Sequence, residues 1–388
     1  MKYDKSMQVK AHVLRDPATD NNDKAKVGNV DFAATAPGAD RDLATVRAIA
    51  EGGTVPIHFT TVKYYPNNGL VYCGLSAAEN DLLWSFDPKT KKFVDCGFNR
   101  ISDENDHKLH QTLDIASDGV MWGGTSGWVD HSNHAGRRGG SLFSYDPRNG
   151  DLKSHGIPCP HDYIQYTVLD EPRRAIYGGT YPHLMFFRWD MDTGRVRTWF
   201  TGSMMHRAIK DDDGFIWGTY RVGVKENFFK YDPDADQMHH FQFGLPGISA
   251  SFDAATPDTN VIDSIINGGD GYIYIGTNGG SFCRLDPRKE ELQYLCKPVA
   301  NGRLSNMQIA KDGRIFLGAG FGELTSLVAY DRETGAYTNY GLIRDEEMGH
   351  TDMVVHQMTI TDDGTIYCGE TDQGGGRSAY LWECVLED

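Results

Sequence analysis

The chain has 388 residues, a formal net charge of −16 and a mean hydropathy of −0.48. The acidic excess argues against a nucleic-acid-binding surface, which needs a broad basic face. A local group of Arg, Lys and His could still bind an anionic substrate. No run of eighteen apolar residues is present, so we expect no membrane-spanning helix. The start lacks the apolar core of a secretory leader, so we expect a cytoplasmic protein unless a leader has been removed.

The first 52 residues lie outside the pattern that organises the rest of the chain. They are rich in Asp, Asn, Ala and Gly, as in "RDPATDNNDKAKVGNVDFAATAPGADRD". The stretch "SMQVKAHVL" within them could supply a strand to the main fold. Alternatively, the whole region could be a loose polar arm.

From residue 53 to residue 388 one phrase recurs seven times. An acidic-Gly turn precedes a short apolar strand that ends in Gly, and a loop then leads to an aromatic-Asp-Pro segment. The copies begin "NNGLVYCGL", "SDGVMWGGT", "EPRRAIYGGT", "DDGFIWGTY", "GDGYIYIGT", "KDGRIFLGA" and "DDGTIYCGE". The aspartates of the last element are Asp87, Asp146, Asp190, Asp232, Asp286 and Asp331, with Glu383 in the seventh place.

The spacing of these aspartates ranges from 42 residues, between Asp190 and Asp232, to 59 residues, between Asp87 and Asp146. A repeat of about this length, built from short β-like runs, is typical of a propeller with four strands per blade. The sequence therefore predicts an all-β, seven-bladed β-propeller of four-stranded antiparallel blades. The last copy reaches the end of the chain after its third strand, so the N-terminal arm could close that blade.

The start of each innermost strand is where a propeller gathers side chains around its axis. Reading the position eight or nine residues before each acidic-Gly turn gives His58, His110, Tyr163 with Tyr166, His206 with Arg207, Asp263, Asn306 and His356. Four blades of seven place a histidine there, from fourteen histidines in the chain. One such histidine is usually a channel-lining hydrogen-bonder, but four on one face favour a functional site.

The loops between the second and third strands open on the same face. Blade two has a long one, "SGWVDHSNHAGRRGGS", which we expect to arch over the channel mouth. The candidate groups in these loops are His131, His134, Arg137 and Arg138 in blade two, Tyr181 and His183 in blade three, and Arg221 in blade four. The Arg137–Arg138 pair could equally be a solvated turn.

Two chemistries suit a ring of His, Tyr and Arg. In the first, Arg or His neutralises the carboxylate of a uronate, a His or Tyr removes the neighbouring proton, and a second group protonates the leaving oxygen. In the second, neutral imidazoles from several blades hold one metal at the axis.

The seven "DGxIYxGT…YDP" blades, with histidines at the second inner strand and in its following loop, resemble the seven-bladed polysaccharide lyases of the ulvan lyase and rhamnose–glucuronate lyase type. At the level of the blade phrase the resemblance covers residues from about 55 to 388. It implies an inner-strand His, a His from the next loop, a Tyr from the next blade and an Arg on the carboxylate. Residue by residue, it implies His110, His131 or else His134, Tyr166 or else Tyr163, and Arg221 or Arg207. Blade three departs from the pattern by offering Tyr181 and His183 where an Arg is expected.

Other propeller families compete with this resemblance. Streptogramin lyases use His and a divalent cation, and oligogalacturonate lyases and carotenoid oxygenases hold a metal with inner-strand histidines. His58, His206 and His356, together with His110, would answer that description. A non-enzymatic binding platform is a further alternative, although such a face should carry exposed hydrophobic anchors.

The leading expectation is a carbon–oxygen lyase acting on a uronate-containing saccharide, with His110, His131 and Tyr166 as the catalytic set. Substrate contacts are expected from Arg221, Arg207, His134, Tyr181, His183 and Arg138. No cofactor is required in this interpretation, whereas the metal-dependent alternative needs a divalent ion such as Ca, Mn or Zn.

Overall fold

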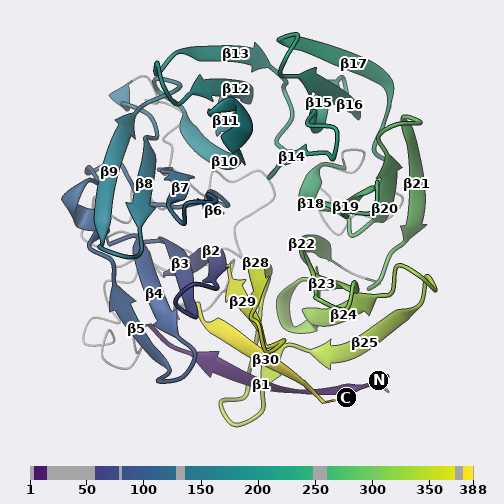
Figure 1. Cartoon of the computed structure of the whole chain (residues 1–388). Helices are drawn as coiled ribbons and strands as arrows, with labels where there is room; N and C mark the ends of the chain where they lie inside the picture. The colour runs from purple at the N-terminus through teal and green to yellow at the C-terminus, as the bar shows by residue number, and fades with distance from the viewer. Residues whose placement is uncertain are drawn as a thin grey trace.

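Seven small antiparallel sheets are arranged like the blades of a propeller around a central axis (Figure 1). The structure is a computed structural model that describes residues 4–14, 57–77, 81–127, 136–247, 260–300, 302–371 and 379–387. Each of the seven sheets has four strands, which confirms the predicted all-β, seven-bladed propeller. The helical elements described are three short 3-10 turns, at Phe98–Arg100, Glu171–Arg173 and Gly322–Leu324.

Within blades one to six the strands follow one another in sequence from the axis outward. Blade one contains β2 (His58–Tyr65), β3 (Leu70–Ser76), β4 (Leu83–Asp87) and β5 (Lys92–Asp95). Blade two contains β6 (Asp114–Ile115), β7 (Met121–Gly124), β8 (Leu142–Asp146) and β9 (Asp151–Gly156). Blade three contains β10 (Tyr163–Asp170), β11 (Ala175–Tyr181), β12 (Met185–Asp190) and β13 (Val196–Phe200).

The remaining blades follow the same plan. Blade four contains β14 (Ile209–Lys210), β15 (Ile216–Val222), β16 (Lys225–Asp232) and β17 (Gln237–Gly244). Blade five contains β18 (Ile262–Asn267), β19 (Ile273–Thr277), β20 (Phe282–Asp286) and β21 (Glu291–Cys296). Blade six contains β22 (Arg303–Ile309), β23 (Ile315–Gly320), β24 (Ser326–Tyr330) and β25 (Tyr337–Leu342). Blade seven has β28 (Val355–Ile360), β29 (Ile366–Glu370) and β30 (Leu381–Glu387), and a small ribbon of β26 (Arg344–Asp345) and β27 (His350–Thr351) precedes it.

The fourth strand of blade seven comes from the other end of the chain. Strand β1 (Ser6–His12) pairs antiparallel with β30, from Ser6 opposite Glu387 to His12 opposite Leu381, and Figure 1 shows both termini at this blade. The carboxylate of Glu383 bonds His12 Nε2 at 2.6 Å and Lys91 Nζ of blade one at 2.6 Å. Backbone pairing and this ionic contact therefore close the ring at one place. Most of the predicted arm, residues 15–52, lies outside the described residues.

The recurrent aspartates of the repeat are turn residues. The Asp87 carboxylate accepts the backbone N–H of Lys89 at 2.8 Å, and the Asp331 carboxylate accepts that of Glu333 at the same distance. An Asp at the end of a strand thus starts the hairpin to the outermost strand by capping its own turn. These hydrogen bonds lower the pKa of both carboxyl groups. The recurrent aspartates therefore have a structural role in the turns, and we do not expect them to act as catalytic carboxylates.

Close packing between blades explains the glycines that end the second strands. A Cβ at Gly276 would lie 2.6 Å from the Leu304 carbonyl oxygen of the next blade, and one at Gly369 would lie 2.7 Å from the Phe59 carbonyl oxygen of blade one. The neighbouring strand-two positions carry large buried rings, among them Trp217, Tyr177 and Tyr274. The apolar core therefore lies between the blades, and polar side chains remain for the axis. No helix in the described ranges is long and apolar enough to cross a membrane.

Candidate functional site

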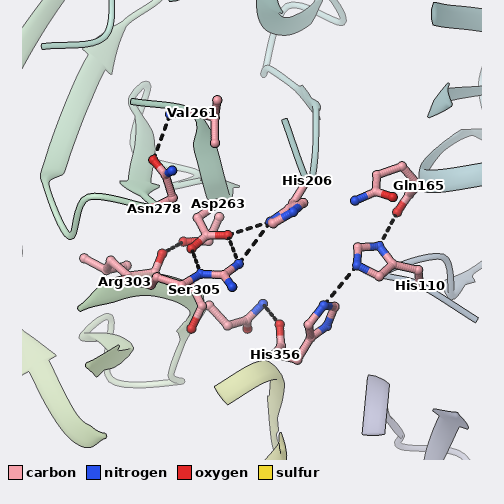
Figure 2. Close-up of polar contacts among 12 residues, drawn as sticks. His110, Gln165, His206, Val261, Asp263, Asn278, Arg303, Ser305 and His356 are labelled. Carbon is pink, nitrogen blue, oxygen red and sulfur yellow. Dashed lines mark hydrogen bonds and ion pairs between the residues drawn. The ribbon is translucent and has the colours of Figure 1, made fainter. Parts of the chain in front are cut away.

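Three histidines from different blades meet at the axis (Figure 2). His110 lies four residues before β6, His206 lies three residues before β14, and His356 lies within β28. The ring centroids are 4.6 Å apart for His110 and His356, 5.6 Å for His110 and His206, and 6.5 Å for His206 and His356. The ring of blades brings together residues that are 246 positions apart in the chain.

His110 and His356 form a pair whose Nε2 atoms face each other at 3.0 Å. Nδ1 of His110 lies 2.7 Å from the backbone carbonyl oxygen of Gln165, and Nδ1 of His356 lies 2.8 Å from that of Thr60. A carbonyl oxygen only accepts hydrogen bonds, so both Nδ1 atoms carry the proton. In two neutral rings, each Nε2 would then present a lone pair to the other. The contact is therefore suited to one shared proton or one cation.

The surroundings of His110 favour its neutral form. Burial lowers the pKa of its imidazole well below the usual value, and the neighbouring His356 and His206 lower it further. The hydrogen bond to Gln165 opposes this shift without reversing it. At neutral pH His110 is therefore unprotonated and available as a proton acceptor.

His206 is held by an ionic arrangement instead. Its Nδ1 lies 2.5 Å from Oδ1 of Asp263, and the Arg303 guanidinium bonds both oxygens of that carboxylate at 2.6 and 2.7 Å. Burial alone would raise the pKa of Asp263, but the charge and hydrogen bonds of Arg303 and the contact with His206 hold it well below its usual value. The ionised Asp263 orients the His206 ring in the way that a buried carboxylate orients a catalytic or metal-binding imidazole.

The residue after His110 has an unusual backbone. Gln111 has a φ of 47°, in the left-handed region that a side chain such as glutamine rarely adopts. Its side chain is buried, with 2% of the residue exposed, and Oε1 has no hydrogen-bond partner among the described residues. Such strain is commonly kept at functional positions, where the surroundings hold it.

Three of the predicted substrate-binding groups on the loops are bound to carboxylates. Arg138 contacts Asp103 at 2.8 Å and Asp106 at 3.2 Å, and Arg221 contacts Glu226 at 2.7 Å. His183 contacts Asp162 at 2.6 Å while its side chain remains 53% exposed. These contacts hold His183 and Arg221 within their own blades and tie Arg138 to the segment that connects blades one and two.

Four other predicted residues, Tyr166, Tyr181, His58 and Arg207, lie in different environments. Tyr166 is 1% exposed within an apolar core cluster, where burial raises the pKa of its phenol and its hydroxyl has no partner among the described residues. This is a poor setting for the proton transfer that the sequence suggested. Tyr181 packs on Tyr163 with ring centroids 5.2 Å apart, and His58 has Nδ1 3.3 Å from the Thr371 hydroxyl. Arg207 points to the axis, where it lies 3.4 Å from Asp114.

His131 and His134 fall in residues 128–135, outside the described part of the chain, so their proposed role stays a prediction. Sequence reasoning missed Arg303, and it read Asp263 as an inner-strand residue without giving it a role. One feature of the sequence could have indicated the role of Asp263: it is an acidic residue at the inner position of blade five, next to the blade that carries His206.

The described residues contain no group of three or more His, Cys, Asp or Glu side chains arranged to hold a metal ion. As the side chains stand, the axial cluster is a histidine pair in direct contact with a third ring beside it. The seven cysteines are all free thiols.

Comparisons with known proteins support the fold. No family model and no curated protein matches this sequence. Among solved structures, a streptogramin B lyase superimposes with a TM-score of 0.61 at 14% identity, over 86% of this chain and 95% of that chain. The extracellular domain of BT4673 from B. thetaiotaomicron gives 0.59 at 14% identity over 84% of this chain, and that of BT3049 from the same organism gives 0.54 at 16% identity over 85%.

This chain spans only 38% of the BT4673 structure and 39% of the BT3049 structure. At these identities the likeness concerns the fold alone, because propellers carry unrelated functions on one scaffold. What the site does must therefore be argued from its own residues.

Proposed function

We propose that the chain is a carbon–oxygen lyase that cleaves a uronate-containing saccharide by β-elimination at the axial histidines. The observation that carries this proposal is the His110–His356 contact, with Nε2 atoms 3.0 Å apart and both Nδ1 atoms directed at backbone carbonyls. Such a pair can take up one proton and return it at the same place. An elimination needs both events, because one bond to hydrogen and one bond to oxygen are broken.

The proposed first step is proton removal by His110. Its Nε2 takes the proton from the carbon that bears the uronate carboxylate, and the electron pair of that C–H bond becomes part of a new carbon–carbon double bond. The glycosidic C–O bond on the adjacent carbon breaks, and its electron pair leaves with the oxygen. The low pKa of His110 keeps it ready to accept the proton at neutral pH.

The proposed second step returns the proton. While it resides on the pair, the proton forms an Nε2–H hydrogen bond between His110 and His356, which stabilises the protonated state. It then passes to the leaving oxygen, so one product has an unsaturated end, the other gains a hydroxyl, and the histidines return to their neutral form. Because Tyr166 lies in the core, the proposal assigns the partner role to His356.

The substrate carboxylate must also be neutralised, since a negative charge beside the reacting carbon opposes proton loss. Arg207 is suited to this role because it follows His206 in the chain and reaches the axis, and Asp114, at 3.4 Å, is its only ion-pair partner among the described residues. Arg221 is less suited, because Glu226 occupies its Nε at 2.7 Å.

A divalent-cation-dependent lyase is the second candidate, and the same Nε2 contact favours it. Two lone pairs that face each other, with backbone acceptors behind each ring, resemble the outer-shell support that metal-binding histidines receive. His110 and His356 would hold the ion, and His206 is the nearest further imidazole. Imidazole nitrogen suits Mn or Zn better than Ca, which prefers oxygen. When bound, such an ion would polarise a substrate oxygen as a Lewis acid.

The test is the ultraviolet absorbance of an unsaturated product. The purified chain is incubated with a panel of uronate-containing saccharides, with and without a chelator, beside His110→Ala. Absorbance that rises, survives chelation and disappears in the variant is the expected result. A rise abolished by the chelator and restored by Mn or Zn supports the second candidate. Absence of product on every saccharide contradicts both and leaves a binding platform.

A further inference from the structure

A cavity of ≈280 Å³ lies along the axis and is lined by the chain neighbours of two axial histidines. Its walls come from the inner strands β2, β14, β18 and β22 and from Gln111 and Arg207, which follow His110 and His206 in the chain. The polar residues that line it are Lys63, Gln111, Arg207, Ser264, Asn267, Asn306 and Gln308. Its size is close to the lower end of the roughly 300–1,000 Å³ typical of small-molecule pockets, so it suits one small ligand.

The cavity carries more positive than negative charge, in a protein whose net charge is −16. The Lys63 side chain makes no hydrogen bond or ion pair with any described residue. Arg207 has Asp114 at 3.4 Å, but Asp114 also accepts from the Leu169 backbone N–H at 3.2 Å and the Thr167 hydroxyl at 3.3 Å. One carboxylate therefore serves two cations, and Lys63 lacks a counter-charge of its own.

Burial makes this situation unfavourable without a ligand. It lowers the pKa of the Lys63 ammonium, an effect that Asp114 only partly opposes and Arg207 increases. Lys63 is half-buried, and a partly desolvated cation of this kind is stabilised by an anion that takes the place of water. The charge arrangement thus points to an anionic ligand.

Gln111 supplies a second, independent indication of a ligand. Its side chain lines the same cavity, 2% of the residue is exposed, and Oε1 lacks any hydrogen-bond partner in the described residues. Buried polar atoms normally have a partner. The missing partner is a hydrogen-bond donor, which a carboxylate or a halide cannot be but a hydroxyl group can.

We propose that the axial cavity binds a small hydroxylated carboxylate, with the carboxylate between Lys63 and Arg207 and a hydroxyl donating to Gln111 Oε1. This proposal rests on the proposed function and deepens it, because a uronate residue has this combination of groups. Lys63 then becomes a substrate-binding residue that the sequence did not suggest. The cavity reaches the histidine pair through Gln111, which follows His110 in the chain.

The test is isothermal titration of the full chain with D-glucuronate, its neutral methyl ester and inorganic phosphate. Glucuronate itself has no leaving sugar, so binding is measured without turnover. We expect binding of glucuronate, none of the methyl ester, and a Kd at least about tenfold weaker in Lys63→Met, because a charge-assisted contact is lost. Gln111→Met should weaken glucuronate binding by a smaller factor.

Two further variants keep the result interpretable. Lys311→Met removes an exposed lysine that pairs with Asp362 on the surface, and it should bind glucuronate like the wild type. Lys63→Arg keeps the charge and should retain binding within a few-fold, which separates loss of charge from loss of fold if Lys63→Met is unstable.

Equal affinity for glucuronate and its methyl ester, or an unchanged Kd in Lys63→Met, would overturn the proposal. Phosphate binding as tightly as glucuronate would overturn the assignment to a hydroxylated carboxylate. The outcome is separable from the proposed lyase activity. If glucuronate binding depends on Lys63 but no saccharide yields a product, the proposed binding site stands and the proposed lyase activity is wrong. If a product forms but the Kd for glucuronate is unchanged in Lys63→Met, the proposed lyase activity stands and the proposed binding site is wrong.

Discussion

Basic side chains have different surroundings in two regions of this propeller: the rim, meaning the loops between second and third strands that carry Arg138, Arg221 and His183, and the central axis. On the rim, Arg138, Arg221 and His183 each have a carboxylate within 3.2 Å. At the axis, Arg207 and Arg303 also have carboxylate partners, but His110 and His356 meet each other, and Lys63 has no ion pair with any described residue.

The difference matters because acidic residues outnumber basic ones, 54 to 38. In such a chain almost any exposed cation can find a carboxylate nearby. An ion pair of a rim arginine therefore does not indicate whether a ligand binds there. A half-buried basic group that the fold leaves without a counter-charge of its own, such as Lys63, is more informative, because desolvation makes that arrangement costly. His206 lies between the two cases, since it is axial but bound to Asp263.

The largest effect is expected for His110→Ala. Removing the proton acceptor should lower kcat by about 10²–10⁴-fold on whichever saccharide is cleaved, the usual contribution of a general base. The matched control is His239→Ala, an exposed histidine on the outermost strand β17, which should keep wild-type kcat. Steady-state kinetics on both variants checks this. Activity of His110→Ala within a few-fold of wild type would remove the histidine pair from the mechanism.

A large effect on stability is expected for Asp263→Asn. The change leaves Arg303, with 17% of its side chain exposed, facing a neutral amide, and the cost should be about 3 kcal/mol, the lower end for a broken buried pair. The Asp263 pKa is depressed in the folded state, so its stabilisation is present above the unfolded value of about 3.9 and is lost as pH falls through the folded pKa.

Thermal unfolding followed by circular dichroism should therefore show a difference between wild type and Asp263→Asn that is full at pH 7 and shrinks below about pH 4. Asp362→Asn, at an exposed carboxylate, should show no comparable loss. A difference that is independent of pH would mean that the ionised carboxylate is not the source of the stability.

The sequence indicated the architecture better than the site, for a physical reason. Blade turns depend on local chemistry, such as an Asp that caps its own hairpin, and local chemistry repeats visibly along the chain. His110, His206 and His356 could be identified because the start of each inner strand converges on the axis. The contact between His110 and His356 could not be predicted from the sequence. The two residues belong to blades two and seven, which lie on either side of blade one and approach each other only because the ring closes.

The cations were harder to judge from the sequence. Arg221 and Arg303 look alike as letters, but Arg221 is bonded to Glu226 across its own hairpin and Arg303 to Asp263 of the preceding blade. Lys63 has no distinguishing motif at all. Which positive charges lack a counter-charge is set by distances between blades, and these distances have no signature in one sequence.

An effect on pH dependence should distinguish the axial histidines from ordinary ones. An unperturbed histidine titrates near pH 6.5, but burial and two neighbouring rings lower the pKa of His110. A general base must be unprotonated to act. As pH is lowered, kcat/KM should therefore stay constant past about pH 6.5 and decline only at a clearly lower pH. A pH profile of kcat/KM measures this. A half-maximal value near 6.5 would indicate that His110 is not the titrating base.

The smallest effect is expected on the rim, for Arg138→Gln. Its side chain is 37% exposed, so solvent screens the pair with Asp106 and the loss should be no more than about 1 kcal/mol. Asp106 also retains the Asp103 backbone N–H at 3.0 Å, which leaves its buried carboxylate partly satisfied. The thermal midpoint should therefore fall by clearly less than in Asp263→Asn under the same conditions. A fall of equal size would mean that the rim pair is as poorly solvated as the axial one, and the contrast between the two regions would no longer explain where a ligand binds.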